Sequence, residues 1–160
     1  MPEIISNTSP LQYLHQCGVL DILCVMYGRI VVSTAVADEL EEGRKRGVVL
    51  PDLRTLPWIT VKTPRNVKRL PLASELGAGE LEVLALAAET VDALVILDDG
   101  LARQYARIHG IRFTGTCGVL LKAKQQRLIV AVCPLLDKLA DFGFYLDDRT
   151  RSVILHLAGE

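Results

Sequence analysis

The sequence predicts a three-layer α/β domain with a central parallel sheet of about five strands, completed by C-terminal helices. Short apolar runs alternate with helical patterns up to about residue 115, and after it only helical patterns follow. Most of the short runs are almost continuously apolar, which is typical of strands that are buried on both faces of a parallel sheet. Such an alternation implies right-handed β-α-β crossovers.

Five segments rich in Ile and Val are expected as strands, at 3–6, 29–33, 58–61, 92–97 and 111–114. Helices are expected at 10–17, from a cap at Ser33 to about Glu42, at 79–89, 101–109, 118–127, 134–143 and 147–158. Segments 43–57 and 62–74 carry the Pro, Gly and charged residues of surface loops. With no repeat and no linker, the whole chain, 1–160, is expected to be a single domain.

The composition excludes several classes of protein. The chain has 160 residues, is 50% hydrophobic and 23% charged, and contains no apolar run of the roughly 18 residues that a membrane span needs. Glycine-rich phosphate loops are absent from the sequence. The N-terminus lacks the features of a signal peptide, and the four cysteines lack zinc-site spacing, so we expect a cytoplasmic protein with reduced thiols and no membrane partner.

The net charge of −1 conceals an asymmetry along the chain. Segment 100–136 contains six basic residues and no acid, so the remainder of the chain is strongly acidic. A basic segment of this kind could hold a polyanion, although solvated helix faces are an equally simple explanation. The candidate contacts to a nucleic-acid backbone are Arg103, Arg107, Arg112, Lys122 and Lys124.

Polar residues follow two of the expected strands. Ser6-Asn7-Thr8-Ser9 follows the first strand, and Asp98-Asp99 follows the fourth. Ligands of open parallel sheets bind at the carboxyl ends of strands. Adjacent carboxylates repel one another, and a bound divalent cation would offset that repulsion. Helix capping is the alternative, since Asp99 can cap the helix that follows it and Asn7 can cap the first helix.

Two further acids lie on helices that can border this edge. Glu39 shares a helix face with the apolar Ala35 and Val36, although it could also be a surface residue at the edge of that face. Glu80 begins a helix, where an acid is favourable without any function, but the preceding glycines allow a ligand to approach closely. An all-oxygen set of ligands suits Mg²⁺ or Mn²⁺, and beside a basic segment it suggests metal-assisted phosphodiester hydrolysis.

Five segments, in order, carry a family resemblance: "IISNTSPL", "VVSTAVADEL", "LGAGELEVLALA", "ALVILDDGLARQYA" and "FTGTCGVLLKAK". The chain resembles the PIN-domain superfamily, and more closely a prokaryotic PIN-like branch whose substrates are unassigned. The resemblance implies a compact α/β/α fold and a ribonuclease that acts on single-stranded RNA, with Mg²⁺ or Mn²⁺ held by three or four acids. It also implies, as one role, a toxin with an antitoxin partner, often as a homodimer.

The resemblance assigns the candidate metal ligands and catalytic residues position by position: Asn7, Glu39, Glu80 and Asp99, with Asp98 adjacent. It further implies a hydroxyl at Thr8 or Ser9 and a site-lining residue at Thr114 or Thr116. Asn7 departs from the pattern, because an amide stands where the family has its first acid.

Three hypotheses follow for the function. The first is a metal-dependent ribonuclease with Asn7 as a weak ligand. The second is a weakened or inactive PIN-like protein that binds nucleic acid or a protein partner through the same groove, because the uncharged Asn7 holds a cation less strongly than Asp would. The third is a regulatory or dimerisation domain of unrelated chemistry.

Overall fold

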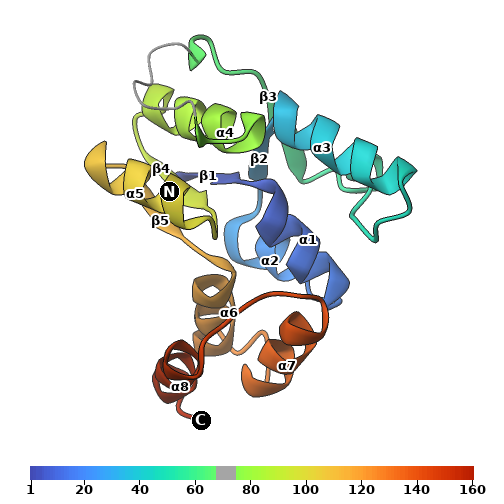
Figure 1. Cartoon of the computed structure of the whole chain (residues 1–160), viewed down its shortest axis with the longest axis vertical. Coiled ribbons are helices and arrows are strands. Elements are labelled where there is room, and N and C mark those ends of the chain that lie inside the picture. The colour runs from blue at the N-terminus through green and yellow to red at the C-terminus, as the bar shows by residue number, and fades with distance from the viewer. Residues whose placement is uncertain (68–74) are drawn as a thin grey trace.

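The computed structural model describes residues 1–67 and 75–160. Its core is one parallel sheet in the order β3-β2-β1-β4-β5 (Figure 1). The strands are β1 (Glu3–Ser6), β2 (Ile30–Ser33), β3 (Ile59–Lys62), β4 (Ala93–Ile96) and β5 (Arg112–Thr114). The α/β class, the parallel sheet and its five strands are therefore as the sequence predicts, and each strand lies within about one residue of its expected segment.

The burial of each strand follows from its place in the sheet. All four residues of β2 are buried, and in β1 Ile4 and Ile5 are only 4% and 1% exposed. The edge strands β3 and β5 contain no fully buried residue. Covering both faces of the inner strands removes their Ile and Val side chains from water, which is the main source of stability for a sheet of this type.

The sheet grows in opposite directions from its centre. The chain passes from β1 to β2 and β3 on one side, then crosses over to β4 and β5 on the other. The carboxyl ends of β1 and β4 therefore form the switch point at which open α/β sheets bind ligands. Asn7 directly follows β1, and its backbone N–H donates to the carbonyl of Ile96 at 3.0 Å. The first polar turn thus lies beside the end of β4.

Helices cover both faces of the sheet (Figure 1). α4 (Ala78–Glu89) packs over β1, β2 and β4, and α5 (Gly100–Ile108) packs on β5. On the other face α1 (Thr8–Gln16) and α2 (Ile22–Tyr27) meet α6 (Thr116–Gln125), and α3 (Thr34–Lys45) contacts both α1 and α4. The three-layer arrangement is typical of a PIN-like fold.

Several helix boundaries differ from expectation. α1 begins at Thr8, so Pro10 lies in its first turn without opening it. α3 continues through Gly43, because the chain turns only at Gly47, where φ is +85°. α2 has no periodic signal in its six apolar residues, and the short 3₁₀ helix Leu53–Thr55 lies within an expected loop. Of the expected loop 62–74, Lys62 belongs to β3, and residues 68–74 lie outside the described residues.

The C-terminal helices α6, α7 (Cys133–Asp141) and α8 (Asp148–Leu157) are joined by the side chain of Glu160. Its carboxylate accepts from the N–H groups of Val132 at 2.7 Å and Cys133 at 3.0 Å, and from Lys124 Nζ at 2.9 Å. The residue that caps α7 is Val132, whose side chain cannot accept a hydrogen bond. Glu160 supplies the acceptor that the start of α7 lacks.

Replacing Glu160 by Gln is expected to lower the melting temperature at neutral pH. The backbone N–H of Val132, with Lys124 and Cys133, lowers the pKa of Glu160 from 4.5 to about 2. A lowered folded-state pKa stabilises the fold above pH 4.5, and this contribution is lost as the pH falls from 4.5 toward 2. Melting curves of both proteins between pH 7 and 3 test this. The difference between their melting temperatures should narrow only below pH 4.5. A gap that stays constant with pH would contradict the assignment.

Within the described part of the chain, no helix is both long enough and apolar enough to cross a bilayer.

Candidate metal and nucleic-acid site

Asn7 is at the centre of the candidate site, and its side chain does not cap α1. The residue occupies the N-cap position with extended backbone angles, yet its side chain makes no capping hydrogen bond. It is 2% exposed, and its Nδ2 donates to Glu80 Oε1 at a long 3.4 Å. Asn7 Oδ1 is buried without a hydrogen-bond partner among the described residues. A buried amide oxygen left unpaired in this way costs free energy unless a ligand supplies the missing partner.

Glu39 reaches the same site from α3. Thr8 Oγ1 donates to Glu39 Oε2 at 2.5 Å, so Thr8, the residue after Asn7, orients this carboxylate. Glu39 is exposed at the edge of the buried face of α3, which Val36 and Leu40 form. Its position leaves the carboxylate accessible to solvent and to a substrate.

Gly79 allows Glu39 and Glu80 to come together. A Cβ at position 79 would lie 2.7 Å from Glu39 Oε1, which is closer than a carbon atom can approach. Gly79 directly precedes Glu80 in the first turn of α4, and α3 packs against α4. The second glycine of the "GAGE" segment, Gly79, therefore makes room for a carboxylate from a neighbouring helix.

Replacing Gly79 by Ala is expected to separate stability from metal binding. Ala favours the helix by up to about 1 kcal/mol, which offsets part of the crowding, so the melting temperature should change little. The displaced Glu39 carboxylate should weaken Mn²⁺ binding by about tenfold or more. Calorimetric Mn²⁺ titration checks this, with Gly100→Ala as a matched control, because a Cβ at position 100 meets nothing within 4 Å. Equal Mn²⁺ affinity in both variants would contradict this geometry.

The structure orients Asp98 away from this group. Its Oδ1 accepts from the N–H of Thr116 at 2.9 Å and its Oδ2 from the hydroxyl of Thr116 at 2.6 Å. Arg103 Nη2 lies 3.8 Å from Asp98 Oδ1. Asp98 thus joins the end of β4 to the first turn of α6 and to α5, and Thr116 is fully buried as its partner.

Asp99 serves as a helix cap. Its Oδ2 accepts from the N–H of Ala102 at 2.8 Å, at the N-cap of α5, and the residue is exposed. This is the capping alternative expected for Asp99. Ser9 lies in the first turn of α1, and Thr114 ends β5 beside α6.

One acid at the site escaped the sequence prediction. Glu82 Oε2 accepts from the N–H of Ala35 at 2.7 Å, in the first turn of α3. Ser33 caps the same helix end, accepting from Val36 N–H at 3.1 Å. Glu82 therefore fixes the start of α3 against α4 and positions Glu39 one turn further on. The spacing of Glu80 and Glu82 could have predicted that these two acids have different roles. Residues two apart in a helix project in different directions, so the two carboxylates do not face the same group.

The residues that come together fit a hard divalent cation by their chemistry. Asn7, Glu39 and Glu80 offer only oxygen ligands, and a cation would give Asn7 Oδ1 the partner it lacks. Across residues 1–67 and 75–160, however, no three acidic, His or Cys side chains gather closely enough to hold a metal by themselves. Of the five expected ligands, the contacts above connect Asn7, Glu39 and Glu80, while Asp98 and Asp99 have other hydrogen-bond partners.

The candidate nucleic-acid contacts do not form one patch. Arg112 begins the edge strand β5, so it lies at the amino ends of the strands, whereas Asn7 follows the carboxyl end of the central strand β1. Arg112 also pairs with Asp92. Lys124 pairs with Glu160, and Lys122 lies 4.7 Å from the ring centroid of Tyr27. The structure brings together only Arg103 and Arg107, one helical turn apart on α5, and both lie over the ring of Phe113.

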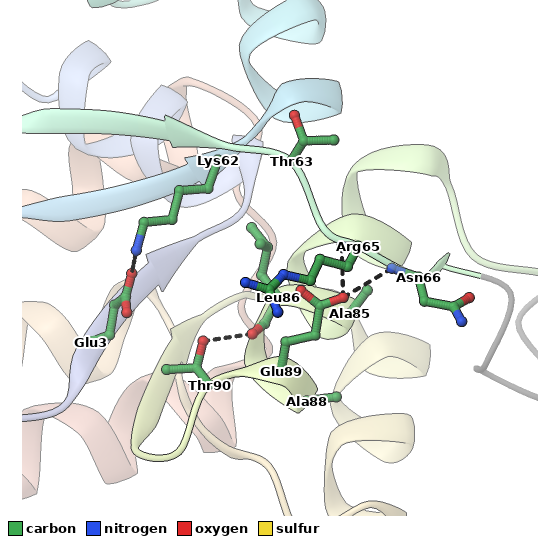
Figure 2. A pocket seen from close by; sticks show the side chains of 10 residues that line it. All are labelled: Glu3, Lys62, Thr63, Arg65, Asn66, Ala85, Leu86, Ala88, Glu89 and Thr90. Atoms are coloured by element: carbon green, nitrogen blue, oxygen red, sulfur yellow. Dashed lines mark hydrogen bonds and ion pairs between the residues drawn. The ribbon is translucent and has the colours of Figure 1, made fainter.

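A separate cavity of about 1070 Å³ lies beside the C-terminal end of α4 (Figure 2). None of the expected site residues lines it. Its carboxylates are already engaged: Glu3 pairs with Lys62, and Glu89 accepts from the backbone N–H groups of Arg65 and Asn66. The cavity therefore offers no unengaged carboxylate to a metal.

Comparison with known proteins agrees with this fold. A family model described as a PIN domain matches residues 3–160. No curated protein matches the sequence. Since the match covers nearly the whole chain and the fold has the expected parallel sheet, the chain belongs to the PIN-domain superfamily, whose members are in general divalent-metal-dependent nucleases that act on nucleic acid.

Proposed function

We propose that this protein is a ribonuclease that hydrolyses single-stranded RNA with the aid of Mg²⁺ or Mn²⁺, held by Asn7, Glu39 and Glu80. One observation carries the proposal: a buried amide oxygen, without a hydrogen-bond partner in the described part of the chain, lies beside two carboxylates at the switch point of the sheet. A buried oxygen acceptor in all-oxygen surroundings is what a hard cation requires.

Each residue has a separate task in this proposal. Asn7 Nδ2 holds Glu80, and Thr8 holds Glu39, so both carboxylates are oriented before a substrate arrives. A bound cation supplies a water of lowered pKa and neutralises charge on the phosphate. Arg103 and Arg107 lie on α5, which follows Asp98 and Asp99, and both contact the ring of Phe113. From there they can hold the phosphate backbone of the RNA.

The amide of Asn7 also supports a second candidate. Because the amide is neutral, it holds a cation less strongly than a carboxylate would, and its Nδ2 already engages one oxygen of Glu80. This contact favours a weakened or inactive PIN-domain protein that binds nucleic acid or a partner through the same groove. The two candidates share a fold and differ in whether RNA is cut.

Cleavage of a labelled single-stranded RNA distinguishes the candidates. The purified protein is stripped of metal with EDTA, dialysed and assayed with and without added Mn²⁺ at millimolar concentration. The ribonuclease proposal expects cleavage that appears with Mn²⁺ and disappears with EDTA. Intact RNA under all these conditions, with RNA still bound, would contradict it and support the second candidate.

The finer expectations from the resemblance remain predictions: a toxin role, an antitoxin partner, a homodimer and a cytoplasmic location. The four cysteines are free thiols, which agrees with a reducing compartment. Growth arrest on expression, relieved by the product of an adjacent small gene, would support the toxin role, and normal growth would argue against it.

A further inference from the structure

A hollow of about 430 Å³ lies at the carboxyl end of β5. Its lining includes Asp98, Arg103, Phe113, Thr114, Cys117 and Tyr145. Asp98 follows β4, which lies next to β1, so the hollow begins one strand beyond Asn7. Residues 144–146, in the link from α7 to α8, also line it. In Figure 1 this link passes beside α6. A volume of this size is in the range of small-ligand sites.

One wall of the hollow combines the ring of Phe113 with the guanidinium of Arg103, whose charge is paired with Asp98 at 3.8 Å. The guanidinium carbons of Arg103 and Arg107 lie 5.3 and 5.1 Å from the ring centroid of Phe113. Arg103 Nε also donates to the carbonyl of Leu97 at 2.9 Å, which fixes its side chain. Stacked guanidinium and aromatic planes are surfaces on which unpaired bases stack.

An exposed aromatic ring on an anchored segment also lines the hollow. The ring of Phe144 packs edge-on against Tyr13, with centroids 5.0 Å apart, and its N–H donates to the carbonyl of Leu139 at 2.9 Å. The next residue, Tyr145, lines the hollow but is 84% exposed. Phe144 anchors the segment while the ring of Tyr145 stays exposed, and a stacked ligand would bury that ring.

Two glycines of the "TGTCG" segment keep the polar atoms of the hollow in place. A Cβ at Gly118 would lie 2.2 Å from Thr114 Oγ1, and a Cβ at Gly115 would lie 1.9 Å from Arg103 Nη2. Burial, together with the nearby Asp98, raises the pKa of Cys117 to about 12, so its thiol is neutral and not a nucleophile. The hollow is therefore a shaped recognition surface without a reactive group of its own.

We propose that this hollow binds one unstacked base of a single-stranded RNA, stacked between Tyr145 and the surface formed by Phe113 and Arg103. The inference rests on the proposed function for the identity of the substrate. The aromatic faces accept any base without sequence preference. The hollow would thereby hold the RNA one β-strand away from Asn7.

Binding of a fluorescently labelled eight-nucleotide RNA, followed by anisotropy in EDTA, tests this inference without cleavage. Tyr145→Ala should raise the Kd for this RNA by about fivefold or more, because one base loses its stacking partner. Tyr145→Phe keeps the ring and should bind like the wild type. Phe142→Ala is the matched control, because Phe142 is 46% exposed on the same link and does not line the hollow. Since Tyr145 is exposed, its replacement should not disturb folding.

A second RNA, with abasic sites throughout, shows whether the base is what Tyr145 contacts. The loss caused by Tyr145→Ala should vanish on the abasic strand. An unchanged Kd for Tyr145→Ala on normal RNA, or an equal loss on abasic RNA, overturns the inference, as does absence of RNA binding by the wild type.

Cleavage in Mn²⁺ is measured separately, so the two proposals fail separately. Tyr145-dependent binding without cleavage supports the base site and contradicts only the ribonuclease. Cleavage together with binding that ignores Tyr145 supports only the ribonuclease and overturns the base site.

Discussion

Replacing Asn7 by Asp is expected to raise Mn²⁺-dependent RNA cleavage by about ten- to a hundredfold, the range over which changes around a metal site alter affinity or activity. The new carboxylate adds a formal negative charge beside Glu80, where the amide supplies only a neutral oxygen. Charge count among the ligands is a main determinant of divalent-cation affinity. Initial cleavage rates across a Mn²⁺ series measure the effect, and Asn7→Ala, which adds no charge, should not show the gain.

The same substitution is expected to destabilise the metal-free protein by about 1–3 kcal/mol. It replaces a hydrogen-bond donor to Glu80 with a like charge, at a position that is only 2% exposed. Mn²⁺ should restore much of the lost stability. Melting temperatures with and without Mn²⁺ check this. A variant that is equally stable in both conditions, with unchanged cleavage, would show that Asn7 does not face the cation.

Replacing Glu80 by Gln is expected to reduce Mn²⁺-dependent cleavage by about a hundredfold or more. The change removes the carboxylate that Asn7 contacts and leaves the shape of the side chain almost unaltered. Glu75→Gln is the matched control, since it removes the same charge from an exposed position shortly before α4. Cleavage rates at saturating RNA measure both variants.

Two outcomes for Glu80 would contradict the site. Equal cleavage by Glu80→Gln and the wild type would exclude Glu80 as a ligand. Equal losses in Glu80→Gln and Glu75→Gln would point to a general electrostatic effect on RNA binding, with no specific role for the Asn7 group.

The architecture followed from the sequence because parallel strands covered on both faces leave a strong apolar signal. The run Ile30–Ser33 is fully buried, and Val95 and Ile96 of β4 are equally inaccessible. α2 could not be foreseen, since its six apolar residues lack a helical period and its helical state depends on packing against β2 and α6. Some helix ends were predicted wrongly because a local signal did not decide them. The sequence predicted that α3 would end before Gly43, but the helix continues through it.

The site was predictable in its location but not in its pairings. The sequence indicated that polar residues follow β1 and β4, and the switch point brings those ends together. It could not indicate that Asp98 would be engaged by Thr116, and it left open whether Asp99 would cap α5. Such pairings depend on side-chain directions that only the folded chain fixes, and the same holds for Arg112, which pairs with Asp92 at the amino ends of the strands.

Isothermal titration of the metal-free wild type with Mn²⁺, repeated with Glu80→Gln and Glu75→Gln, tests most directly whether Asn7, Glu39 and Glu80 form a cation site. We expect saturable binding in the wild type and in Glu75→Gln, and its loss or a weakening of at least about tenfold in Glu80→Gln. Absence of binding at millimolar Mn²⁺, or the same affinity in all three proteins, would contradict the site.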